Sequence, residues 1–139
     1  MHAEEQPDAD MLIAVERVAD FIRSGGNGSA EQIFASGDVT IIENFAPYVF
    51  GGADAVKTWS EHMLAHLSGL AELRHVFGRA CDFSRAGNEV YFSLPTTWSG
   101  ANRGKAFTEH GGWAFVLKKQ GSEWRVRSYG WAVIESSST

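Results

Sequence analysis

The spacing of the apolar residues changes half-way along this chain, and this change limits the possible folds more than any other feature. Up to about residue 67, apolar side chains recur every three or four positions, which is the period of a helix with one buried face. From about residue 70 they tend to alternate with polar ones, which is the period of a strand. A chain with helices first and strands afterwards is expected to be α+β, not a parallel βαβ protein.

The first half of the chain is predicted to contain three helices and one strand. Their expected ranges are about 11–22, 29–37 and 54–67 for the helices and 39–42 for the strand. Asp8 or Asp10 can cap the first helix, because an aspartate side chain accepts a hydrogen bond from a free N–H of the first turn. The second helix is short, because Gly37 breaks it.

The second half is predicted to form one curved antiparallel sheet. Its four strands are expected at about 70–84, 88–99, 105–119 and 123–134. The links between them are short and rich in turn residues, which favours a meander in which each strand pairs with the next.

Strict alternation along these strands also predicts which side chains face the helices. Phe92 and Trp98 share one face of their strand, and Trp113 shares a face with Glu109. By the same rule Tyr129 and Trp131 lie on the opposite face of the last strand. A bulge would exchange the two faces, and Gly111-Gly112 is one place where a bulge is expected.

Composition excludes several classes of protein. The chain has 139 residues, which suits a single domain over 1–139 with an ordered core at about 8–134. Its net charge is -5, so we expect no nucleic-acid partner. It has no secretory signal and no apolar run of membrane-spanning length, so we expect no membrane association and a cytoplasmic location. Its one cysteine, Cys81, allows no internal disulfide and is expected to be a buried, inert thiol.

Several short motifs, in this order, carry a resemblance to a known family. They are Ile33-Phe34-Ala35-Ser36-Gly37-Asp38 with the following strand, Gly52-Ala53-Asp54-Ala55-Val56, Trp113-Ala114-Phe115-Val116-Leu117 and Glu123-Trp124-Arg125-Val126. Over about 10–134 the chain resembles the NTF2-like superfamily, in particular its SnoaL-like and ketosteroid-isomerase-like branch. The resemblance implies a cystatin-like, cone-shaped domain whose helices and curved sheet enclose a pocket for a small apolar molecule. It also implies a homodimer formed through the convex sheet face, to which Tyr129 and Trp131 are assigned.

The resemblance transfers a catalytic base to this chain but not the groups that assist it. In ketosteroid isomerases a carboxylate at the end of the first strand is the general base, and Glu43 occupies that position. The tyrosine expected on the first helix corresponds to Val18, and the protonated aspartate expected on the fourth strand falls near Gly111. Because such donors stabilise the charge that develops during reaction, steroid isomerisation is not expected here.

Nine residues are therefore predicted to form the site. The catalytic candidates are Glu43, His75 and Glu109, and the substrate-binding candidates are Phe45, Tyr48, Trp59, Phe92, Trp98 and Trp113. No cofactor and no metal ion are expected. His62 and His66 are four residues apart on one helix, but the spacing lacks the glutamate of zinc peptidases. One of the two histidines is expected to be able to edge the pocket.

Three hypotheses about function follow. The first is an isomerase, cyclase or hydratase without cofactor, in which Glu43 abstracts a proton from a small apolar molecule. The second is a binding or dimeric assembly domain without catalysis, and the third is a domain whose aromatics fill the cavity completely. A catalytic pocket is expected to hold Glu43 within hydrogen-bond reach of a second titratable group. A pure binding pocket is expected to leave it isolated or paired with an arginine.

Overall fold

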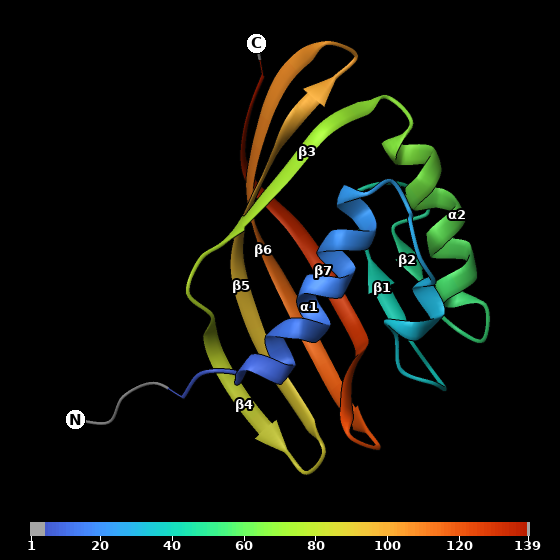
Figure 1. Cartoon of the computed structure of the whole chain (residues 1–139), viewed down its shortest axis with the longest axis vertical. Coiled ribbons are helices and arrows are strands. Elements are labelled where there is room, and N and C mark those ends of the chain that lie inside the picture. Colours follow the sequence, from blue (N-terminus) through green and yellow to red (C-terminus); the bar gives the residue numbers. More distant parts are fainter. Residues whose placement is uncertain (1–4, 139) are drawn as a thin grey trace.

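A computed structural model describes residues 5–138, which form helices packed on one curved sheet (Figure 1). The helical elements are α1 (Ala9–Arg23), the 3-10 turn η1 (Ala30–Gln32) and α2 (Ala55–Leu67). The strands are β1 (Thr40–Ile42), β2 (Val49–Phe50), β3 (Leu70–Phe77), β4 (Cys81–Ala86), β5 (Glu89–Asn102), β6 (Lys105–Gln120) and β7 (Glu123–Ser138). The α+β prediction is confirmed.

The sheet has the strand order β2-β1-β7-β6-β5-β3, with β4 also paired to β5. The long strands β5, β6 and β7 form the predicted antiparallel meander. In contrast, β1 pairs with β7 in parallel, which makes the sheet mixed and not purely antiparallel as predicted. This pairing places Ile41 opposite Tyr129 and so brings the end of β1 to the middle of the last strand.

The two helices form where the apolar period predicts them. The Asp8 side chain accepts a 3.0 Å hydrogen bond from the Met11 N–H and caps α1. The apolar face of α1, which includes Val15 and Val18, is buried against β7, β6 and β3. Helix α2 instead packs on η1, β1 and β2 and buries Trp59 and Met63. The two helices therefore cover different parts of the sheet.

The predicted second helix over 29–37 is wrong. Only one 3-10 turn, Ala30–Gln32, forms there, and the Ser29 side chain makes no capping hydrogen bond. Past this turn the backbone pairs with β7. The Ala35 N–H donates to the Val126 carbonyl at 2.8 Å, and the Val126 N–H donates to the Ile33 carbonyl at 3.0 Å. These bonds to the sheet replace those that a continuing helix would make.

The predicted strand over 70–84 is divided in two, because β3 ends at Phe77 and β4 begins at Cys81. Gly78 lies between them, where an added Cβ would approach the Pro95 carbonyl oxygen to 3.3 Å. Cys81 itself is exposed, so the expectation of a buried thiol is wrong.

The predicted orientation of Tyr129 is also wrong. Alternation puts it on the outer face, but its side chain is only 2% exposed and belongs to the core. The cause is a bulge in β7: Val126 pairs with Leu117 and Ser128 pairs with Val116, so Arg127 is an extra residue. Past this residue the faces of β7 are exchanged, which turns both Tyr129 and Trp131 toward the helices. Neither is therefore available to the dimer interface to which they were assigned.

A single cluster of buried apolar side chains joins the helices to the sheet. Phe92, Phe115 and Leu117 are fully buried within it. Among the described helices, neither is both long enough and apolar enough to cross a membrane.

Candidate functional site

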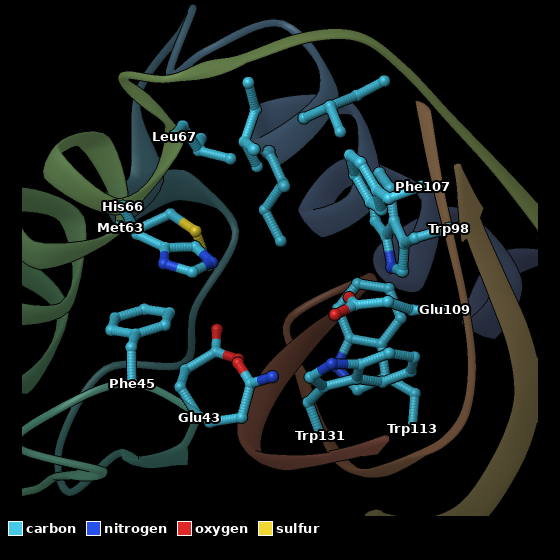
Figure 2. Close-up of a pocket in the computed structure, with 14 residues that line it drawn as sticks. Glu43, Phe45, Met63, His66, Leu67, Trp98, Phe107, Glu109, Trp113 and Trp131 are labelled. Carbon is cyan, nitrogen blue, oxygen red and sulfur yellow. The ribbon is translucent and has the colours of Figure 1, made fainter. Parts of the chain in front are cut away.

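A cavity of about 70 Å³ lies between α1, α2 and the sheet (Figure 2). Its aromatic lining residues are Phe45, Trp98, Phe107, Trp113 and Trp131, and its titratable ones are Glu43, His66 and Glu109. The remaining lining residues are Ile22, Asn44, Met63, Leu67, Leu70 and Leu73. None of these described residues is a lysine or an arginine. The lining is thus mostly apolar and aromatic, and the only groups of the described lining that can carry a negative charge are two carboxyl groups.

Glu43 owes its position to β1. It is the first residue after that strand, and its N–H donates to the Tyr48 carbonyl at 2.9 Å. Side chains of a strand alternate, so Glu43 and the buried Ile41 point inward while Ile42 is 47% exposed. A carboxyl group that follows this strand is directed into the protein, and only 6% of Glu43 is exposed.

Two donors from different elements hold the Glu43 carboxyl group. The indole N–H of Trp59, on α2, donates to its Oε2 at 2.9 Å. The hydroxyl of Tyr129, on β7, donates to the same oxygen. Within the described part of the chain, Oε1 has no hydrogen-bond partner, and Figure 2 shows the carboxyl group projecting into the cavity. One oxygen is therefore anchored and the other remains for a ligand.

Burial dominates the protonation of this group. Desolvation raises the pKa of Glu43 to about 7, although the hydrogen bonds from Trp59 and Tyr129 lower it in part. Burial, with the neighbouring Glu43 charge second, raises the pKa of Tyr129 well above its usual range. At neutral pH Glu43 therefore exists in both forms while Tyr129 stays a hydrogen-bond donor. A carboxyl group of this kind can accept a proton and return it.

Glu109 lines the cavity, as its shared parity with Trp113 predicts. The bulge near Gly111 does not disturb this parity, because the extra residue, Ile134, lies on β7 and not on β6. Glu109 is partly exposed, and desolvation raises its pKa. Figure 2 shows Glu109 beside Trp98 and Trp113, with Glu43 on the other side of the cavity beside Phe45.

His75, the third catalytic candidate, lies outside the lining. Its Nε2 is 3.1 Å from the Glu16 carboxylate on α1, and its ring packs against Phe77 and Trp98. Glu16, Asp20 and His75 are also the group among the described residues whose ligand atoms lie close enough for a metal ion. However, Asp20 is paired with Arg23 at 3.1 Å, and Glu16 with His75. The structure does not bring His75 together with Glu43.

The substrate-binding candidates divide into two sets. Phe45, Trp98 and Trp113 line the cavity. Trp59 is fully buried behind Glu43, and Phe92 packs on Phe83 and Phe115 in the core. Tyr48 is 57% exposed and lies outside the lining.

Sequence reasoning missed the inward orientation of two residues of the site. Tyr129 and Trp131 were assigned to the outer face, and no local pattern marks the bulge that turns them inward. His66 lines the cavity and stacks on Phe45 with ring centroids 4.5 Å apart. It is exposed at the rim, and partial burial lowers its pKa, so the neutral ring is favoured. Of the two helix histidines, one of which was expected to be able to edge the pocket, His66 lines the cavity and His62 does not.

The structure also explains why a ketosteroid-isomerase donor is missing at Gly111. A Cβ at this position would lie 2.2 Å from the Ala132 carbonyl oxygen and 2.8 Å from the Trp131 ring. No side chain fits there without moving β7. At the other donor position, Val18 is fully buried and apolar.

No family model matches the sequence, and no curated protein matches it. Solved structures do match. The Kfla4162 protein from Kribbella flavida is 8% identical with a TM-score of 0.76, over 93% of this chain and 91% of that one. A candidate ketosteroid isomerase from Shewanella frigidimarina is 18% identical with a TM-score of 0.68, over 90% and 96%. The type 2 hexachlorocyclohexane dehydrochlorinase LinA is 8% identical with a TM-score of 0.66, over 96% and 93%.

This chain has the NTF2-like fold. The resemblance read from the short motifs is confirmed at the level of the fold. At these identities the similarity establishes the fold alone.

Proposed function

We propose that this protein is a small-molecule enzyme that works without a cofactor, with Glu43 as the base that moves a proton on carbon. The observation that carries the proposal is a buried carboxyl group on a cavity wall with a pKa of about 7. A base whose pKa lies near the working pH combines a useful ionised fraction with enough basicity. Perturbed carboxyl groups in clefts are also typical of active sites.

The contacts of Glu43 favour catalysis over simple binding. A pure binding pocket was expected to leave this carboxyl isolated or paired with an arginine. Instead it accepts a hydrogen bond from Tyr129, a second titratable group, and it makes no ion pair with any described residue. Glu109 is a second carboxyl group on the cavity wall, and desolvation raises its pKa as well, which places two perturbed carboxyl groups in one cavity.

Two of the similar structures carry names that fit this chemistry. One is a candidate ketosteroid isomerase and the other a hexachlorocyclohexane dehydrochlorinase, and both names describe a reaction at carbon. These names support a reaction of the isomerase or hydratase kind. Steroid isomerisation itself is disfavoured, because the oxyanion donors of ketosteroid isomerases are missing here. A cavity of about 70 Å³ also suits a small substrate.

Solvent exchange tests the proposal directly. In D₂O, the wild-type protein is expected to exchange the acidic C–H of small cyclic ketones and to move the double bond of cyclohex-3-enone into conjugation. Both reactions are expected to be slower than in an enzyme that has the missing oxyanion donors. Glu43→Gln keeps the size of the side chain but cannot accept the proton, so the rate is expected to fall by about 100-fold or more. NMR follows the exchange and absorbance follows the conjugation.

The matched control is Glu61→Gln, which removes an exposed carboxylate from α2 outside the cavity. Its rate is expected to equal that of the wild type. Full exchange by Glu43→Gln would show that another group is the base.

A further inference from the structure

The ionisable and aromatic residues that line the cavity together favour a positively charged ligand. Five aromatic side chains and two glutamates line it, and none of its described lining residues is a lysine or an arginine. We propose that the cavity binds a small organic cation, an amine or ammonium group held between Glu43 and Glu109 against the tryptophan rings. This ligand class deepens the proposed function, but binding itself does not depend on turnover.

The three tryptophans Trp98, Trp113 and Trp131 line the cavity next to one another. Trp113 lies between the other two: its ring centroid is 5.9 Å from that of Trp131 and 6.0 Å from that of Trp98. The planes meet at 70° and 57°, so the rings are tilted toward one another and not stacked flat. A cation that reaches the face of one of these indole rings is attracted by its π-electrons, and indole attracts a cation best among aromatic side chains.

The two carboxyl groups lack a positive partner. Neither Glu43 nor Glu109 takes part in an ion pair among the described residues. They come from different sides of the cavity, Glu43 from the end of β1 and Glu109 from β6, and both face the space between (Figure 2). A cation in this space compensates the desolvation that raises the pKa of both groups.

The third titratable lining residue does not oppose this arrangement. His66 stacks on Phe45 at the rim, and its lowered pKa keeps it neutral near pH 7. An anionic ligand would meet two carboxyl groups and no compensating charge. The volume of about 70 Å³ further limits the cationic group to a few heavy atoms.

A positively charged substrate would also compensate in part for the missing oxyanion donors. Val18 and Gly111 provide no donor to stabilise an enolate. A positive nitrogen on the substrate makes a neighbouring C–H more acidic and offsets the negative charge left when Glu43 takes its proton. The substrate then supplies part of the stabilisation that protein donors give elsewhere.

The test compares choline with its neutral isostere dimethylbutanol, in which carbon replaces the quaternary nitrogen. Both are titrated into the full-length protein at about pH 8, where most of Glu43 is ionised, and binding is followed by calorimetry and by the indole N–H signals in NMR spectra. Choline is expected to bind about tenfold tighter than dimethylbutanol, because the shape is the same and only the charge differs.

Glu109→Gln separates charge from shape. It is expected to weaken choline about fivefold while leaving dimethylbutanol unchanged, and Glu61→Gln is expected to change neither. Glu43→Gln provides a second variant with the same expectation. Equal binding of the two probes, tighter binding of dimethylbutanol, or no binding of choline at millimolar concentration would each overturn the proposal. Choline binding without proton exchange on any probe would contradict the proposed enzyme activity alone.

Discussion

Glu43 is a carboxyl group placed where water cannot stabilise its charge. Trp59 and Tyr129 both donate to it, yet these two hydrogen bonds compensate only part of the desolvation, and its pKa remains at about 7. The folded protein therefore favours the neutral acid more than the unfolded chain does. The property that suits this residue to proton transfer also makes its ionised form destabilising.

The pH dependence of stability measures this cost. Between the unfolded pKa of 4.5 and the folded pKa of about 7, the folded state binds more protons, so the free energy of unfolding falls as pH rises through this window. Glu43→Gln removes the titration. At about pH 8 the variant is expected to exceed the wild type by up to roughly 3 kcal/mol, and at about pH 4 this advantage is expected to vanish.

Urea denaturation of both proteins at the two pH values checks this expectation. Glu61→Gln serves as the control for removing an exposed carboxylate from α2. A difference between Glu43→Gln and the wild type that stays constant with pH would show that Glu43 titrates normally.

At the scale of the element, the bulge in β7 decides which side chains reach the site. Arg127 has no partner residue on β6, and past it the strand presents Tyr129 and Trp131 to the helices. If Arg127 were instead paired on β6 as in a regular strand, Tyr129 and Trp131 would point to the outer face, and Glu43 would lose one of its two donors and the cavity one of its tryptophans. The backbone position of Arg127 thus matters more than its side chain.

Two changes in this bulge separate these contributions. Deleting Arg127 and Ser128 together places Tyr129 directly after the inward-facing Val126, so alternation turns the Tyr129 side chain to the outer face. This deletion is expected to destabilise the fold by more than about 3 kcal/mol, because Tyr129 would leave the core and Glu43 would lose a partner. Arg127→Ala removes only the exposed ion pair to Glu89 and is expected to cost about 0.5 kcal/mol or less. Thermal unfolding compares them, and similar losses would contradict the role of the bulge.

At the scale of the whole molecule, the outer face of the sheet carries the remaining prediction of a homodimer. The bulge removes Tyr129 and Trp131 from that face. A dimer formed there would therefore use other outward-facing residues of β7 and of the strands beside it. On β6, Ala114 and Val116 alternate with the buried Trp113 and Phe115 and are only partly exposed. A second copy that packs on this face would cover these small side chains.

Light scattering after size-exclusion chromatography tests the dimer. The wild type is expected to have the mass of two chains, and Val116→Lys is expected to weaken the dimer at least about tenfold, because a charge would be buried in the interface. Val49→Lys, at an exposed position on the edge strand β2, is the control and is expected to leave the mass unchanged. A wild type that runs as one chain at every concentration would contradict the dimer.

The order of helices and strands could be predicted because it depends on local periodicity. The apolar stripes of α1 and α2 and the alternation of β5 and β6 are each visible within a dozen neighbouring residues. The same local information placed Glu43 after its strand and gave Glu109 and Trp113 a common face, and the structure puts all three in one lining.

Tertiary structure decided what local patterns do not contain. The parallel pairing of Ile41 with Tyr129 joins segments far apart in the chain, and the bulge at Arg127 arises from the match between two strands. The turn at Ala30–Gln32 stops because the following backbone bonds to β7. The sequence by itself therefore determined the α+β fold and the presence of a carboxyl group at a strand end. Only the packing of distant elements determined its donors, its pKa and the aromatic cavity it faces, because burial and hydrogen bonding depend on groups that meet only in the folded chain.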